Sequence, residues 1–162
     1  MRDLLANAIA IGVGATAFMD MAALVRRQLF GTPSADYALV GRWLSYMPHG
    51  RFIHRPIAAS PSLRGEGVIG WVAHYGTGIV FAGVLLVVAG EGWARHPTIL
   101  PALAVGIGSV AAPFLLMQPG MGLGVAARLT PHPGAARLRS LATHMLFGIG
   151  LYGAGVAMSL LR

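Results

Sequence analysis

Four long apolar runs follow one another along the sequence, separated by segments rich in proline, glycine and arginine. About 20 apolar residues are needed to cross roughly 30 Å of hydrocarbon. The pattern therefore predicts an all-α polytopic membrane protein, a compact bundle of four transmembrane helices in one membrane domain over residues 1–162. We expect the helices at about 4–25, 68–89, 98–117 and 140–161.

The first run contains Ala15-Thr16-Ala17, which imitates the cleavage site of a signal peptide. The run stays apolar to Val25, and the strong positive charge follows it instead of preceding it. We therefore expect this run to remain as the first transmembrane helix. In the third run Pro113 lacks an N–H, so it should bend the helix and free the carbonyl of Ser109.

A shorter pattern lies between the first two runs, in SADYALVGRWLSYM. Its apolar residues recur at helical spacing, which places one group near a single helical face: Tyr37, Val40, Trp43, Leu44 and Met47. Tyr and Trp favour the headgroup level of a bilayer. The spacing predicts an amphipathic helix in the membrane interface within the first long loop.

Composition agrees with a membrane protein, because 56% of residues are hydrophobic and only 10% are charged. Soluble domains carry about a quarter charged residues. The net charge of +7 comes from arginine alone, and with no soluble domain to present it, nucleic acid is an unsuitable partner. The chain has no cysteine, which excludes disulfides, thiolate metal sites and covalently attached haem.

The arginines predict the direction of the spans. Four spans place the segments 26–67 and 118–139 on one side, and these hold nine of the 12 arginines. The positive-inside rule then places both long loops in the cytoplasm and both termini in the periplasm of a bacterial inner membrane. Five of these arginines are candidates for contacts with anionic lipid headgroups: Arg26, Arg27, Arg42, Arg51 and Arg55.

Each predicted span also contains or ends on a polar residue at a similar depth. Asp20, His74, Gln118 and His144 all fall in the cytoplasmic half, with depths that agree to within about one helical turn. Polar residues in a bilayer point inward, because lipid exposure costs several kcal/mol. His54, in the first long loop, is the best candidate for a further contributor.

Three interpretations of this polar layer remain open. An Asp–His pair can satisfy itself and fix the register of the bundle. Alternatively, the layer binds or passes a proton, a metal ion held by Asp20, His74 and His144, or a small polar ligand. A third interpretation is haem b held between His74 and His144. No HExxH, catalytic triad or paired-carboxylate motif supports an enzyme.

The competing class of function is an accessory protein that packs on another membrane protein or on itself, with a purely structural polar layer.

Several stretches also show a family resemblance, in order and over nearly the whole chain: GVGATAFMD, GRWLSYMPHGRFIH, GWVAHYGTG, MQPGMGLGVAARLTPHP and RLRSLATHMLFGIGLY. They resemble short bacterial inner-membrane proteins known as domain of unknown function family 2938. The resemblance implies four membrane helices in a bacterial inner membrane and no particular activity.

Overall fold

The computed structural model describes residues 2–32 and 35–161, and these form helices and turns without a strand. Four helices in the described residues are long and apolar enough to cross a membrane: Asp3–Phe30, Glu66–Ala89, Ile99–Gly120 and Pro133–Leu160. The α-helices are α1 Arg2–Phe30, α2 Tyr37–Tyr46, α3 Glu66–Ala89, α4 Ile99–Gly108, α5 Gln118–Gly120 and α6 Pro133–Leu160. The all-helical prediction with four long apolar helices is confirmed.

Short helical turns connect these helices: η1 Met47–His49, η2 Ile57–Ala59, η3 Glu91–Ala94, η5 Val125–Ala127 and the π-helix η4 Pro113–Met117. In the third span α4 ends at Gly108, a turn follows at 109–110, and Pro113 opens a π-helix. The bend expected at Pro113 stays a prediction. α1 and α6 are longer than their apolar runs. Arginine is a good helix former, so the helices continue through Arg27 and Arg139 beyond the hydropathy boundaries.

The described chain divides into two compact units. Unit 1 comprises residues 1–34, 75–109 and 141–162, and unit 2 comprises residues 35–74 and 110–140. Unit 1 therefore contains α1, α4, most of α3 and most of α6. Unit 2 contains α2, α5, the first turns of α3 and the first turns of α6.

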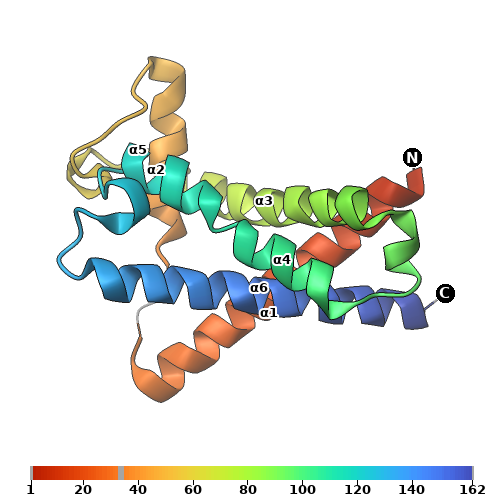
Figure 1. The fold of residues 1–162 in the computed structure, drawn as a ribbon. Coiled ribbons are helices and arrows are strands. Elements are labelled where there is room, and N and C mark those ends of the chain that lie inside the picture. Colours follow the sequence, from red (N-terminus) through yellow and green to blue (C-terminus); the bar gives the residue numbers. More distant parts are fainter. Residues whose placement is uncertain (1, 33–34, 162) are drawn as a thin grey trace. The chain divides into compact units, whose positions relative to one another are not determined.

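In unit 1, α1, α3, α4 and α6 lie side by side, and the beginning of α1, the end of α6 and the α3–α4 connection lie at one end (Figure 1). The helices approach at glycines. Gly12 meets the backbone of Gly78 and Ile79, and Gly106 meets the backbone of Gly148. The core between them is made of Ala8, Ile11, Ala15, Met19, Ala82, Leu85, Leu86, Trp93, Ala94, Ala102, Phe147 and Leu151.

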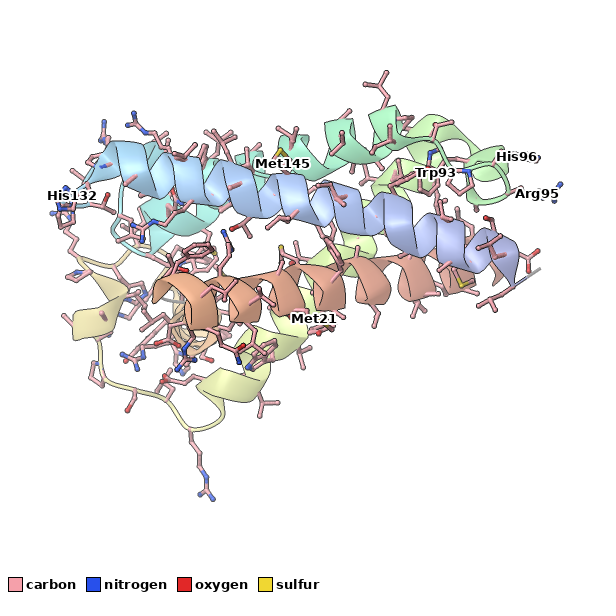
Figure 2. All side chains as sticks on the ribbon, turned by 90° about the horizontal axis from the view of Figure 1, so that it is seen from below. Met21, Trp93, Arg95, His96, His132 and Met145 are labelled. Atoms are coloured by element: carbon pink, nitrogen blue, oxygen red, sulfur yellow. The ribbon has the colours of Figure 1, made fainter. Side chains whose placement is uncertain are left out.

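The connection between α3 and α4 is fixed by one tryptophan. Trp93 is buried, donates its indole N–H to the carbonyl of Thr98 at 3.1 Å, and packs its ring against Gly155 of α6. Figure 2 shows Arg95 and His96 at the tip of the same connection, directed away from the helices. The connection thus has an anchored side and an exposed side.

Unit 2 is built on the docking of α2 against the start of α3. Gly41 of α2 meets the backbone of Glu66 and Gly70, and Gly70 in turn meets the carbonyl of Tyr37. The predicted loop helix is therefore present, with Asp36 capping its first turn. Its apolar side packs within the unit, in a cluster of Tyr46, Ile57 and Met121 with Leu39, Val40, Trp43, Leu63, Met117 and Leu123.

An ion pair fastens the same two helices. Arg42 donates two hydrogen bonds to the carboxylate of Glu66, each at 2.8 Å, and a third to the carbonyl of Ser60 at 3.0 Å. Glu66 also accepts the backbone N–H of Leu63 at 2.8 Å. The hydrogen bonds that Arg42 donates to Glu66 raise the pKa of the guanidinium above its ordinary value. Bidentate pairs of this kind fix geometry, so Arg42 serves the packing of unit 2.

Candidate functional site

His144 is held in unit 1 by a chain of two hydrogen bonds. Its Nδ1 lies 2.7 Å from the hydroxyl oxygen of Ser109, and that hydroxyl lies 2.6 Å from the carbonyl oxygen of Gly106. Ser109 is 2% exposed, and His144 is half-buried. The imidazole on α6 is therefore attached to the C-terminal end of α4.

These two hydrogen bonds indicate which ring nitrogen of neutral His144 carries the hydrogen. A carbonyl oxygen only accepts, and a serine hydroxyl has one hydrogen to donate. The Ser109 hydroxyl therefore donates to Gly106 and accepts from Nδ1–H of His144. In the neutral imidazole this leaves Nε2 without a hydrogen, so Nε2 is the atom that can accept a proton or a hydrogen bond.

The close approach of α4 and α6 makes this geometry possible. Gly106 lies against the Cα and nitrogen of Gly148, and Gly148 lies against Leu103 and the carbonyl of Ala102. Small residues at such contacts allow backbones to approach closely. Gly148 follows His144 by one helical turn on α6, and Gly106 precedes Ser109 by three residues on α4. The packing contact and the hydrogen bonds therefore form one structural feature.

Asp20 forms a second polar contact in unit 1, with the hydroxyl of Tyr75 on α3. One turn earlier on α1, Thr16 is 1% exposed and donates to the carbonyl of Gly12 at 2.8 Å. Arg26 lies near the end of α1, with its guanidinium 3.5 Å from the hydroxyl of Thr143. Polar contacts therefore join α1 to α3 and α1 to α6 in this unit.

His74 belongs to unit 2, in an aromatic group. Its ring stacks on that of Tyr37 with centroids 4.0 Å apart and planes at 23°, and it meets the Trp71 ring edge-on at 5.8 Å. Tyr37 and Trp71 are themselves 4.8 Å apart. Stacking of this kind fixes the plane of the imidazole, and it joins the first turn of α2 to α3.

Gln118 and His54 are also in unit 2, and both are buried. Gln118 is the first residue of α5, and no donor among the described residues reaches its buried Oε1. His54 places Nδ1 3.0 Å from the Ser60 hydroxyl and Nε2 3.3 Å from the carbonyl of Arg51. His54 is therefore part of the folded loop between α2 and α3.

The five predicted site residues thus fall into two groups. Asp20 and His144 lie in unit 1, and His74, Gln118 and His54 lie in unit 2. Among the side chains that the structure describes, no group of three His, Cys, Asp or Glu is arranged to hold a metal ion. A shared layer, a metal held by Asp20, His74 and His144, and haem b between the two histidines stay predictions.

Two partners of the predicted residues were not anticipated. Ser109 and Tyr75 lie inside apolar runs, where a single hydroxyl changes hydropathy little. The only signal for Ser109 was its position four residues before Pro113.

Among the five arginines proposed for lipid contact, Arg42 forms an ion pair with Glu66, and the Arg42 side chain is 13% exposed. The side chains of Arg27, Arg51 and Arg55 are exposed.

The fold defines a class: an all-helical chain with four helices that are long and apolar enough to span a membrane, carrying polar side chains on those helices. The chain belongs to the family described as "Protein of unknown function (DUF2938)", whose model matches residues 9–158. No curated protein and no solved structure matches the chain.

Proposed function

We propose that the chain is a multi-pass protein of a bacterial inner membrane, with its long loops in the cytoplasm and both termini in the periplasm. The exposed apolar surface supports the location, because at most 33% of the most apolar window of any span is buried within the protein. Such a surface is unfavourable in water and favourable in lipid. The unequal distribution of arginine supports the direction.

Within this membrane protein, His144 is the proton-binding group of a site that takes up and releases protons. One observation carries the proposal: Ser109 orders Nδ1, so Nε2 is left as the accepting atom on a half-buried ring. An ionisable side chain inside a membrane is energetically costly. Such residues are therefore usually ones that serve a function.

The hydrogen bonds of His144 support a particular route for the proton. A proton arriving at Nε2 converts the ring to imidazolium, while Nδ1–H keeps its hydrogen bond to Ser109. The carbonyl of Gly106 ends the chain of hydrogen bonds and has no proton to pass on. Uptake and release therefore both use Nε2, and Ser109 positions the ring without relaying the proton. Net flux across the membrane then requires Nε2 to be open to one side and then to the other. Asp20, which contacts Tyr75 in the same unit, is a further ionisable group of unit 1.

The experiment is proton flux into vesicles of phosphatidylethanolamine and phosphatidylglycerol that contain a pH-sensitive dye, driven by a potassium diffusion potential. We expect wild type to carry protons faster than empty vesicles. His144→Ala should reduce the protein-dependent rate about 100-fold, the lower end of what a positioned proton-transfer group contributes.

His96→Ala is the matched control, because His96 lies at the exposed tip of the α3–α4 connection (Figure 2). It should leave the rate within about twofold of wild type. Equal rates for wild type and His144→Ala would contradict the proposal. If His144→Ala lowered only the melting temperature, the polar contacts would be structural, as expected of an accessory protein packed on another membrane protein.

A further inference from the structure

The loop between α2 and α3 forms a broadly open cavity of about 480 Å³ in unit 2. Its polar lining consists of Arg51, His54, Arg55 and Ser60, and the rest of its lining is apolar. We call it the loop cavity. Its lining residues all belong to unit 2, whereas His144 belongs to unit 1.

The loop cavity carries positive charge that the described residues leave uncompensated. Neither Arg51 nor Arg55 has a carboxylate within salt-bridge distance in the described part of the chain. The acidic group bound to this loop is Glu66, and Arg42 occupies it with two hydrogen bonds. Arg42 also donates to the carbonyl of Ser60. Glu66 is therefore neutralised by Arg42, and the charges of Arg51 and Arg55 are left without a carboxylate among the described residues.

The lining is held in place by contacts below the surface. His54 is 5% exposed, and its ring bonds to Ser60 and to the carbonyl of Arg51. Its backbone N–H donates to the carbonyl of Gly120 at 2.8 Å. The guanidinium of Arg51 lies 5.1 Å from the centre of the Tyr46 ring, a cation–π distance. A site ordered before binding loses less free energy when a ligand arrives.

We propose that the loop cavity binds a phosphate group. Two arginine side chains offer planar forks of N–H donors that match phosphate oxygens, and the Ser60 hydroxyl adds a further polar group. The group can belong to a lipid headgroup or to free phosphate. Phe52 and Ile53, between the two arginines, are 56% and 73% exposed, which favours the lipid, because such side chains enter the membrane interface.

The experiment compares two lipids that differ only in the phosphate. Binding of dioleoyl phosphatidic acid and of dioleoylglycerol to the full-length chain is measured by native mass spectrometry from a non-ionic detergent. We expect phosphatidic acid to bind at least about tenfold more tightly, as hydrogen bonds to charged groups predict. Arg51→Gln/Arg55→Gln should remove that advantage.

The control is Arg64→Gln/Arg128→Gln, which removes the same charge from exposed arginines of unit 2 that do not line the cavity. It should change the affinity by less than about threefold, as expected for general surface charge. Arg51→Lys keeps the charge but loses the fork, and should weaken binding severalfold without disturbing the fold. Thermal unfolding of each variant verifies that it is folded.

Inorganic phosphate is the third probe. Saturable phosphate binding that the Arg51→Gln/Arg55→Gln variant loses would support the cavity and identify free phosphate as a ligand. Binding of phosphatidic acid without binding of inorganic phosphate would support it and identify lipid as the source. Equal affinities for the two lipids, or an equal loss in the two double variants, would overturn the proposal.

Discussion

Gly106→Ala is expected to destabilise unit 1 by about 3 kcal/mol or more, at the upper end of what overpacking costs. A β-carbon at this position meets backbone atoms of Gly148. A clashing side chain could rotate away, but the atoms met here belong to the backbone of α6. The backbones of α4 and α6 must therefore separate. α4 and α6 would have to move apart along the contact that holds both helices in the core.

The same substitution should disturb the candidate site. The carbonyl of Gly106 accepts from Ser109, and Ser109 holds His144 across the helix contact. Separation of α4 from α6 lengthens the Ser109–His144 contact, because its two residues are on opposite helices. Gly106→Ala should therefore lose proton flux even at temperatures where the protein remains folded.

Gly108→Ala is the matched control on the same helix. No atom beyond its immediate chain neighbours lies within 4 Å of a β-carbon there, and the residue is exposed. Alanine in place of glycine stabilises a helix by roughly 0.5–1 kcal/mol. Thermal unfolding in detergent should show a large fall in melting temperature for Gly106→Ala and none for Gly108→Ala. Similar curves would mean that α4 and α6 are not in backbone contact.

Gly41→Ala should detach α2 from α3 in unit 2, at a similar cost of about 3 kcal/mol. The added β-carbon would meet the carbonyl of Glu66 and the nitrogen of Gly70. The bidentate contact of Arg42 with Glu66 depends on the same approach, because Arg42 follows Gly41 on α2. Loss of the helix contact should therefore also break the ion pair.

The control for unit 2 is Gly67→Ala, one residue after Glu66 on α3. A β-carbon at Gly67 has nothing within 4 Å. Limited proteolysis of residues 35–65 reports the result. Gly41→Ala should be cleaved much faster than wild type, whereas Gly67→Ala should resist as wild type does. Equal resistance of all three proteins would show that α2 is not docked on α3.

The elements of this fold are local features, and the sequence predicts them for that reason. Apolar runs of sufficient length locate the four spans, and helical spacing locates α2. The ends of α1 and α6 were not predicted, because hydropathy stops at charged residues whereas helical structure does not. Docking of α2 through Gly41 was also not predicted, since its apolar face suited a membrane interface equally well.

The site was predicted in part. Asp20 and His144 are conspicuous because charged or titratable groups are rare in apolar runs. Their partners Tyr75 and Ser109 are not, because hydroxyl residues occur there at little cost. Glycine gives the same ambiguity: the chain has 23 glycines, and only the structure separates Gly106, which meets a backbone, from Gly108, which faces open space.

The central claim is that Ser109 holds His144 with Nδ1 protonated, so that Nε2 accepts the proton. Nitrogen-15 NMR of histidine-labelled protein in lipid, with His144→Gln to assign the resonance, measures this directly. At a pH where the ring is neutral we expect the Nδ1–H form, and we expect Ser109→Ala to abolish that preference. An Nε2–H form in the wild type would contradict the claim, because the ring would then accept from Ser109 and Nε2 could not take up a proton.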